Sequence, residues 1–302
     1  MSEQVTSGSE SWASVEGLPF PLGVSWSADD QAYNFALYSK HATAVRLLLF
    51  CDDFERPHVE LALDPLIHKS GRVWHCRIAE TAAAGCRYYG YVVDGPEPAG
   101  PFELHEFHPE KILLDPYARC IAFPPGFDRT AAIGRGGNLG KAALGVIDAC
   151  APAFDWGGER LSHHESDSLI YELHVRGFTQ HQSSGVSEVA RGTFAGVAEE
   201  IPYLRELGVT IVELMPVFQN DPQGCDSWGY MPMSFFAPHG RYQREQPLRP
   251  QDDPRQHALL GPRDARRRFS LRSRVRVHAQ PRRHDQLRGS ADLRRHPIGP
   301  RL

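Results

Sequence analysis

Residues 134–142 have the glycine content of a loop that binds phosphate. The stretch is GRGGNLGKA, and phosphate loops use glycines so that backbone N–H groups can approach the phosphate oxygens. Arg135 stands at the first glycine of that pattern and Ala142 at its final serine or threonine. Leu139 stands where a dinucleotide-binding loop needs its last glycine. The sequence therefore predicts a glycine-rich connection here and no nucleotide site.

Residues 163–167 carry side chains of the types that bind metal ions. His163 and His164 are followed by Glu165 and Asp167. Adjacent side chains on a polar loop seldom reach one ion together, because a metal site holds its ligands at fixed angles. We expect a solvated loop, and the sequence predicts neither a metal nor an organic cofactor.

Glu172 and His174 form a second pair of titratable side chains. They are two residues apart, so in a strand they point to the same face. Nothing in the sequence pairs them with a nucleophile, and we interpret both as structural residues.

Residues 17–109 alternate apolar and polar side chains with the period of two that is typical of half-buried strands. The apolar positions are Tyr33, Phe35 and Leu37, then Val45, Leu47 and Leu49, then Trp74, Cys76 and Ile78, then Tyr89, Tyr91 and Val93. Turn-forming steps such as Asp-Asp and Gly-Pro separate these runs. The pattern predicts an antiparallel β-sandwich. We expect a disordered leader over residues 1–16 and a connecting segment over residues 110–165.

Residues 166–242 follow a different pattern, with two apolar strands on either side of a helix. The strands are residues 169–175 and residues 209–214. The helical face carries Val197, Ile201, Leu204 and Leu207, and Gly208 follows it as a stop signal. Pro202 lies inside this stretch, so the helix either begins afresh there or kinks. The order predicts a parallel βαβ unit whose strands are covered on both faces.

Residues 243–302 differ from the rest of the chain in charge. They hold 16 Arg, no Lys and six acidic residues, a net charge of +10, whereas residues 1–242 carry −14. With seven Pro and Phe269 as its single aromatic residue, this segment has too little apolar surface to fold, and we expect a disordered tail. Its charge leaves polyanion binding open. The lack of Lys, and of a folded nucleic-acid reader before the tail, disfavours nucleic acid as a partner.

The six Cys are scattered, without a Cys-x-x-Cys pair. A chain of 302 residues needs no disulfide framework, so we expect reduced thiols and a cytoplasmic location. No apolar run approaches about 18 residues, and the start of the chain is polar and rich in Ser and Glu. These features argue against a membrane span and a secretory signal.

Eight short motifs follow one another along the chain. They are residues 21–24 (PLGV), 33–39 (YNFALYS), 87–91 (RYYGY), 107–111 (FHPEK), 115–118 (DPYA), 171–179 (YELHVRGFT), 213–217 (ELMPV) and 227–232 (SWGYMP). Together they resemble the glycogen-debranching and isoamylase branch of the α-amylase superfamily, with its N-terminal carbohydrate-binding module. Residues 175–179 favour the debranching enzymes over branching enzymes and maltooligosyltrehalose hydrolases.

The resemblance implies a multidomain chain in which the β-sandwich is followed by an incomplete (β/α)₈ barrel and the tail. In such barrels the active site lies at the carboxyl ends of the strands. The implied partner is an α-glucan such as glycogen, starch or a limit dextrin. The implied reaction is retaining hydrolysis of α-1,6 linkages by an Asp nucleophile and a Glu acid/base about 5–5.5 Å apart.

The family takes these two carboxylates from barrel strands 4 and 5, after a third strand that ends in Asn-His. The resemblance extends to Tyr242, and no apolar strand ending in Asn-His follows it. We therefore assign no catalytic residue and expect the chain to release no sugar by itself. The Arg and Pro enrichment of the tail suggests a shift of reading frame just after Tyr242.

Tyr230 matches the family's aromatic residue that stacks under the sugar at the cleavage subsite, and Trp228 lies beside it. We take both as substrate-binding candidates, the alternative being that they only pack the loop. Four strand aromatics could form a glucan platform, but such residues are more often core, and we expect core: Trp74, Tyr88, Tyr89 and Tyr91. The alternative function is a non-catalytic α-glucan-binding protein that uses the sandwich alone.

Overall fold

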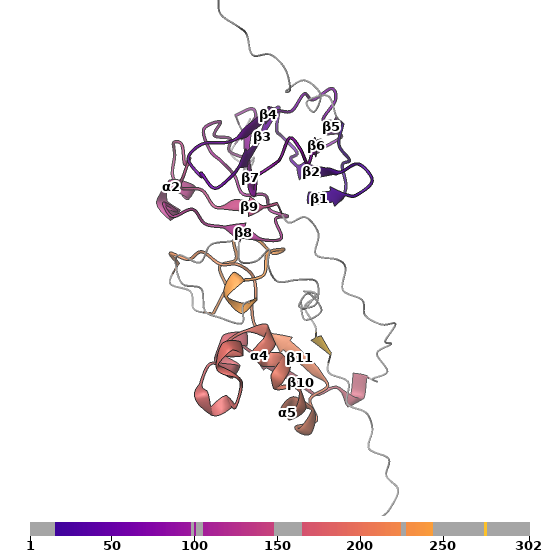
Figure 1. Ribbon diagram of the computed structural model, residues 1–302, viewed down its shortest axis with the longest axis vertical. Helices are drawn as coiled ribbons and strands as arrows, with labels where there is room; N and C mark the ends of the chain where they lie inside the picture. The colour runs from indigo at the N-terminus through magenta and orange to yellow at the C-terminus, as the bar shows by residue number, and fades with distance from the viewer. Residues whose placement is uncertain are drawn as a thin grey trace, which may run out of the picture.

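The computed structural model describes residues 16–97, 100, 105–147, 165–224 and 228–243, together with the backbone of residues 275–276. The N-terminal part consists of two antiparallel sheets, and the C-terminal part is a smaller α/β unit (Figure 1). His163, His164 and nearly all of the predicted leader and tail lie outside the described residues.

The N-terminal sheets have four and five strands. The first sheet has the order β1 (Gly23–Ser27), β2 (Ala32–Tyr38), β6 (Val73–Ala79), β5 (Lys69–Ser70). The second sheet has the order β4 (Val59–Ala62), β3 (Ala44–Phe50), β7 (Tyr88–Asp94), β9 (Leu144–Val146), β8 (Ile121–Ala122). All neighbouring strands in both sheets are antiparallel. The predicted antiparallel sandwich is confirmed.

One apolar core lies between the two sheets. It contains Phe35, Leu37, Val45, Leu47, Leu49, Trp74, Cys76, Ile78, Tyr89, Tyr91 and Val93, which are predicted inward positions. The side chains of Trp74, Tyr89 and Tyr91 are at most 1% exposed, and Tyr88 is 4% exposed. These four aromatics are therefore core residues, as expected, and they offer no platform to a glucan.

The outer face of the second sheet is buried as well. β3 is AVRLLLF, so apolar side chains point to both of its faces, as in sheets that are covered on two sides. Leu48 and Tyr88 on the outer face pack with Ile112 and Leu144. Residues 110–147, which were expected to be a connection, cover this face and supply β8 and β9. The sheet thus continues past the expected boundary.

Asn138, in the glycine-rich stretch, fixes part of this covering segment. Its buried side chain accepts a hydrogen bond from the Ile112 N–H at 2.8 Å and donates one to the Ile112 carbonyl at 3.0 Å. The stretch is preceded by the short helix α2 (Arg129–Ile133) and continues into β9. The residues that directly follow the stretch form the strand β9 and not a helix, so it lacks the helix N-terminus on which a phosphate would sit.

Asp115 joins the same segment to the core. Its Oδ2 accepts a hydrogen bond from the Tyr89 hydroxyl, and its Oδ1 accepts one from the Tyr117 N–H, both at 2.8 Å. Burial raises the pKa of Asp115, while these two hydrogen bonds act in the opposite direction. The carboxyl group is therefore a buried acceptor that holds two donors in place.

The α/β unit has two parallel strands, β10 (Ile170–Leu173) and β11 (Ile211–Leu214). Between them in sequence lie α3 (Val175–Thr179), α4 (Phe194–Glu199) and α5 (Ile201–Glu206). Single 3₁₀ turns cover Glu165–Asp167, Gln182–Ser184, Glu188–Ala190 and Gly240–Tyr242. The short strand β12 (Val275–Arg276) pairs antiparallel with β11. None of the helices in the described ranges is long and apolar enough to cross a membrane.

The helix predicted across residues 197–207 is two helices. Pro202 lies in the first turn of α5, where its missing N–H costs no hydrogen bond. The alternative in which the helix begins afresh is confirmed. Gly208, at φ +82°, follows α5 in the left-handed conformation that glycine adopts most easily. Leu207, expected on the buried face, is 47% exposed.

The first strand of the α/β unit is shorter than predicted. It ends at Leu173 because His174 caps α3, with its Nδ1 accepting a hydrogen bond from the Gly177 N–H at 2.9 Å. Leu173 and Val212 lie in a core with residues of α4 and α5. Ile170 is 56% exposed, so the predicted burial of the strands on both faces is wrong for the described part of the chain.

We predict that Asp115→Ala lowers the free energy of unfolding by about 1–3 kcal/mol, because two buried donors lose their acceptor. Asp115→Asn keeps one acceptor oxygen, so its free energy of unfolding should fall by less. Urea unfolding followed by tryptophan fluorescence measures the difference, with Glu110→Ala at an exposed site as the control. Equal stability of the Asp115→Ala and Glu110→Ala variants would contradict this role.

Candidate functional site

The loop that follows β11 packs against the segment that covers the second sheet. The Ser234 hydroxyl donates to the carbonyls of Pro116 and Ala118, at 3.2 and 3.3 Å. The Phe236 ring stacks on Tyr117 with 4.8 Å between the ring centroids. These contacts join residues more than 110 positions apart in sequence. The loop after β11 and the segment that covers the sandwich therefore form an interface with specific hydrogen bonds.

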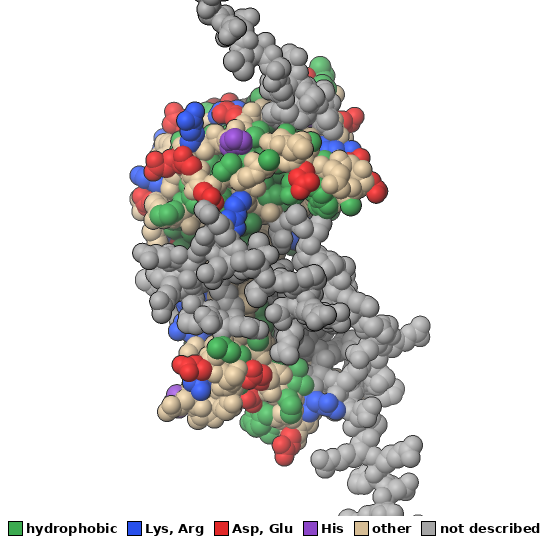
Figure 2. Space-filling model, viewed as in Figure 1, with side chains coloured by type: hydrophobic (Ala, Val, Ile, Leu, Met, Phe, Trp, Pro, Cys, Tyr) green, Lys and Arg blue, Asp and Glu red, His purple; other side chains and the backbone are tan. Residues whose placement is uncertain are grey.

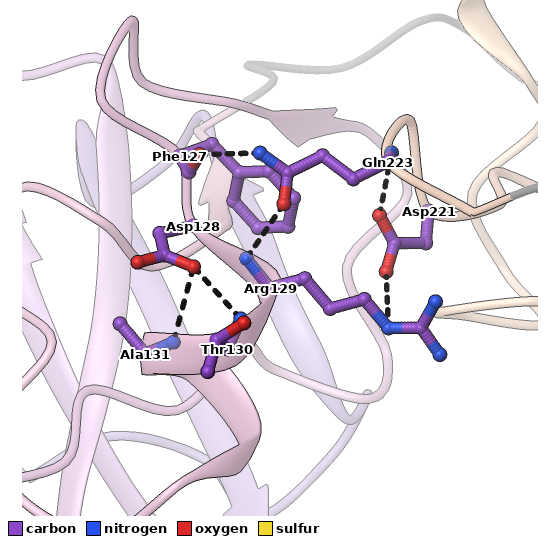
Figure 3. Close-up of polar contacts among 7 residues, drawn as sticks. All are labelled: Phe127, Asp128, Arg129, Thr130, Ala131, Asp221 and Gln223. Carbon is purple, nitrogen blue, oxygen red and sulfur yellow. Dashed lines mark hydrogen bonds and ion pairs between the residues drawn. The ribbon is translucent and has the colours of Figure 1, made fainter.

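Gln223 makes the most specific contact of this interface (Figure 3). Its amide nitrogen donates to the Phe127 carbonyl, and its amide oxygen accepts from the Arg129 N–H, both at 2.8 Å. Asp221 lies beside it, with its Oδ1 bonded to the Gln223 N–H and its Oδ2 3.2 Å from Arg129 Nε. Two side chains of the loop thus hold the start of α2.

Asp128 fixes the other side of this contact. Its Oδ1 accepts hydrogen bonds from the Thr130 and Ala131 N–H groups, at 2.8 and 3.3 Å, which caps α2 (Figure 3). A capped first turn keeps the Arg129 backbone in one orientation. Asp128 therefore fixes the first turn of α2, and Asp221 fixes the backbone of Gln223 that docks onto it.

An open cleft of about 450 Å³ lies between α2 and the loop after β11. Phe127, Arg129 and Ile133 line one side of the cleft, and Tyr230 and Met233 lie on the other. Its surface is mostly apolar, with the ion pair of Arg129 and Asp221 as the polar part. Among the described residues that line it, Asp221 is the single carboxylate. The described lining of the cleft therefore lacks the pair of carboxylates that glycoside hydrolysis needs.

The two substrate-binding candidates from the sequence, Tyr230 and Trp228, lie in different surroundings. Tyr230 lines the cleft and is 63% exposed. Trp228 is 57% exposed, and its ring lies edge-on to His174, 6.2 Å between centroids. Gly229 between them has φ +84°, and a Cβ there would lie 3.0 Å from the Pro216 carbonyl oxygen. Glycine therefore allows the turn that separates the two rings.

His174 lies at the carboxyl end of β10 and has a structural role. Its Nδ1 caps α3, and its Nε2 is 3.3 Å from the Tyr242 hydroxyl. Nearby, the His239 Nδ1 accepts a hydrogen bond from the Arg241 N–H at 3.1 Å. Burial lowers the pKa of His239 to about 4, with Arg241 and Arg176 adding to the effect, so this ring is neutral at pH 7. Glu172 lies on the same strand and is exposed.

The surface of the sandwich part bears no large field of one sign on the face shown in Figure 2. Acidic and basic side chains are interspersed there. A highly charged polymer is bound by a continuous patch of opposite charge. This face has no such patch, and the tail for which polyanion binding was left open lies almost wholly outside the described residues.

Comparison with known proteins shows which family the sequence resembles. Residues 21–118 match the family model of carbohydrate-binding module 48, the isoamylase N-terminal domain. Isoamylase 3 of rice chloroplasts is 38% identical over 245 residues, which are 75% of this chain and 30% of the rice protein. The glycogen debranching enzyme of Serratia proteamaculans is 35% identical over 248 residues, 75% of this chain and 34% of that enzyme.

Solved structures show the same fold. A pullulanase of group B Streptococcus, crystallised with maltotetraose, superposes with a TM-score of 0.54 at 24% identity. The match covers 75% of this chain and 30% of the pullulanase. The chain thus spans about a third of the proteins it resembles. Residues 21–118 belong to carbohydrate-binding module family 48, and the chain is a homologue of isoamylases and glycogen debranching enzymes.

Proposed function

We propose that this chain is the glucan-binding N-terminal portion of a glycogen- or starch-debranching glycoside hydrolase, with Tyr230 as a sugar-stacking residue. The observation that carries the proposal is the exposed Tyr230 ring in a cleft formed where the loop after β11 docks onto Phe127 and α2. The printed names of the homologues, isoamylase and glycogen debranching enzyme, support the same substrate class. The cytoplasmic location remains a prediction.

The composition of the cleft suits a glucose unit. A sugar ring has a C–H face that packs on an aromatic side chain and hydroxyl groups that need hydrogen-bond partners. Tyr230 offers the aromatic face, and Met233 extends the apolar surface. Arg129 and Asp221 at the cleft offer a donor and an acceptor. We propose that these groups orient one glucose unit of an α-glucan chain.

Cleavage requires more than this cleft supplies. In the retaining mechanism one ionised carboxylate attacks the sugar and a second, protonated carboxyl releases the leaving oxygen. Asp221 is paired with Arg129 and hydrogen-bonded to Gln223, so it is poorly suited to either role. We propose that β10 and β11 are the first two strands of a (β/α)₈ barrel, and that residues 16–243 bind the glucan without hydrolysing it.

Tyr230→Ala should raise the Kd for glycogen about two- to twelvefold, because an aromatic stack is worth about 0.5–1.5 kcal/mol. Affinity electrophoresis in glycogen-containing gels measures the change, and Tyr230→Phe, which keeps the ring, should bind nearly as well as the original chain. Tyr203→Ala on α5, at a ring 47% exposed, is the matched control. Equal retardation of the Tyr230→Ala and Tyr203→Ala variants would exclude Tyr230 from the site.

Gln223→Ala should weaken both the docking and the binding. It removes two side-chain hydrogen bonds to the start of α2 and should lower the free energy of unfolding by about 1–2 kcal/mol. The Kd for glycogen should rise as well, because the two walls of the cleft lose a contact. Gln182→Ala, at an exposed 3₁₀ turn, is the control. Unchanged glycogen binding by a destabilised Gln223→Ala variant would place the glucan elsewhere.

The purified chain should release no reducing ends from amylopectin, since the cleft presents one carboxylate where hydrolysis needs two. A reducing-sugar assay measures this, with an active isoamylase as the positive control. Release of linear maltodextrins by the chain, at a rate above the buffer blank, would refute the binding-only assignment.

A further inference from the structure

Cys51, His58 and Cys86 come together at one end of the second sheet. Their ligand atoms, two Sγ and one imidazole nitrogen, all lie within 4.8 Å of one another. The two sulfur atoms are 3.8 Å apart. None of the three lines the cleft described above, so the cluster is independent of the proposed function.

The topology of the sheet explains why the three residues meet. β3 lies between β4 and β7 and is antiparallel to both. The end of β3 is therefore next to the start of β4 and the start of β7. Cys51 directly follows β3, His58 directly precedes β4, and Cys86 comes two residues before β7. The three residues thus lie next to the neighbouring ends of three adjacent strands.

Backbone hydrogen bonds hold this end of the sheet together. The His58 N–H donates to the Leu49 carbonyl and the Arg87 N–H to the Phe50 carbonyl, both at 2.8 Å. The Cys86 N–H donates to the Ala83 carbonyl at 2.9 Å. The backbone next to each candidate ligand is therefore fixed before any ion binds.

The distance of 3.8 Å between the two sulfur atoms fits a tetrahedral ion better than a disulfide. Zinc binds thiolate sulfur at about 2.3 Å, and two such bonds at the tetrahedral angle put the sulfurs about 3.8 Å apart. A disulfide would need about 2.05 Å between them. Two sulfurs and one imidazole are also the donor set that zinc and related thiophilic ions prefer over hard ions. His58 is exposed, so a fourth position can be filled by water.

We propose that Cys51, His58 and Cys86 form a binding site for a divalent cation of the zinc class, with a solvent molecule as fourth ligand. Binding replaces the two thiol protons, which go to solvent, with two metal–sulfur bonds, and no electron is transferred. The bound ion joins the ends of three strands. The sequence contains no local motif for this site, because six residues separate Cys51 from His58. Cys86 comes near these two residues only through the pairing of β3 with β7.

Cobalt(II) titration of the full chain, reduced with a phosphine and freed of metal, tests the site. Sulfur-to-cobalt charge-transfer absorption should appear at a stoichiometry of one ion per chain and disappear when zinc is added. Cys86→Ser should abolish the band. His58→Gln should raise the Kd at least about tenfold, since even losing a supporting partner of a ligand costs about that much. Cys120→Ser changes another half-buried cysteine and should bind cobalt(II) with the affinity of the original chain.

His58→Gln keeps the test decisive if Cys86→Ser fails to fold, because His58 is exposed. Zinc should also raise the Tm of the original chain and of Cys120→Ser more than that of His58→Gln. Absence of the thiolate band in the original chain would overturn the proposal. A thiolate band that persists in the His58→Gln variant with unchanged affinity for cobalt would also overturn it. A Cys51–Cys86 disulfide in air, with no metal uptake after reduction, would show a redox pair instead.

Discussion

The hydrogen bond from the Tyr89 hydroxyl to the buried carboxyl of Asp115 is the contact on which the candidate site depends. Tyr89 belongs to the sandwich core, and Asp115 lies in the segment that covers the outer face of the second sheet. That segment continues into α2, which forms one wall of the cleft. Gln223 ties the opposite wall to it. The position of an exposed tyrosine is thus set by contacts that begin in the core.

Binding and cleaving a glucan are separate physical demands. Stacking needs an aromatic ring on a fixed support, and the turn at Gly229 supplies that support for Tyr230. Hydrolysis needs two carboxylates at a set distance with opposite protonation states. The described part of the chain presents an exposed ring at Tyr230 and one carboxylate, Asp221, in the cleft. The matched residues correspond to about a third of the length of the homologous enzymes.

The sequence predicted the elements whose signal is local. Alternation identified β2, β6 and β7 because one face of each strand is buried in the core. The apolar runs identified β10 and β11, and Pro202 marked the start of α5. The burial of the outer face of β3 was missed, although its run of three leucines indicated two apolar faces. His174 as a cap was missed too, because a strand pattern continues through it.

The contacts that build the cleft could not be predicted from sequence. Gln223 and Arg129 are 94 residues apart, and a hydrogen bond over that separation leaves no periodic signal. The same holds for Cys51 and Cys86, which strand pairing brings within 3.8 Å across 35 residues. Tyr230 was predicted as a substrate-binding candidate because the motif around it resembles that of a known family. The cleft beside it is lined by Phe127 and Ile133, which belong to no such motif.

Hydrogen exchange of the full chain, with and without a linear maltooligosaccharide, tests the central claim most directly. If the cleft between α2 and the loop after β11 holds the glucan, protection should increase in peptides covering residues 127–133 and residues 229–233. Peptides of β2 and β6, whose side chains lie in the sandwich core, should exchange as before. Protection confined to the sandwich sheets, or none at a saturating sugar concentration, would contradict the account.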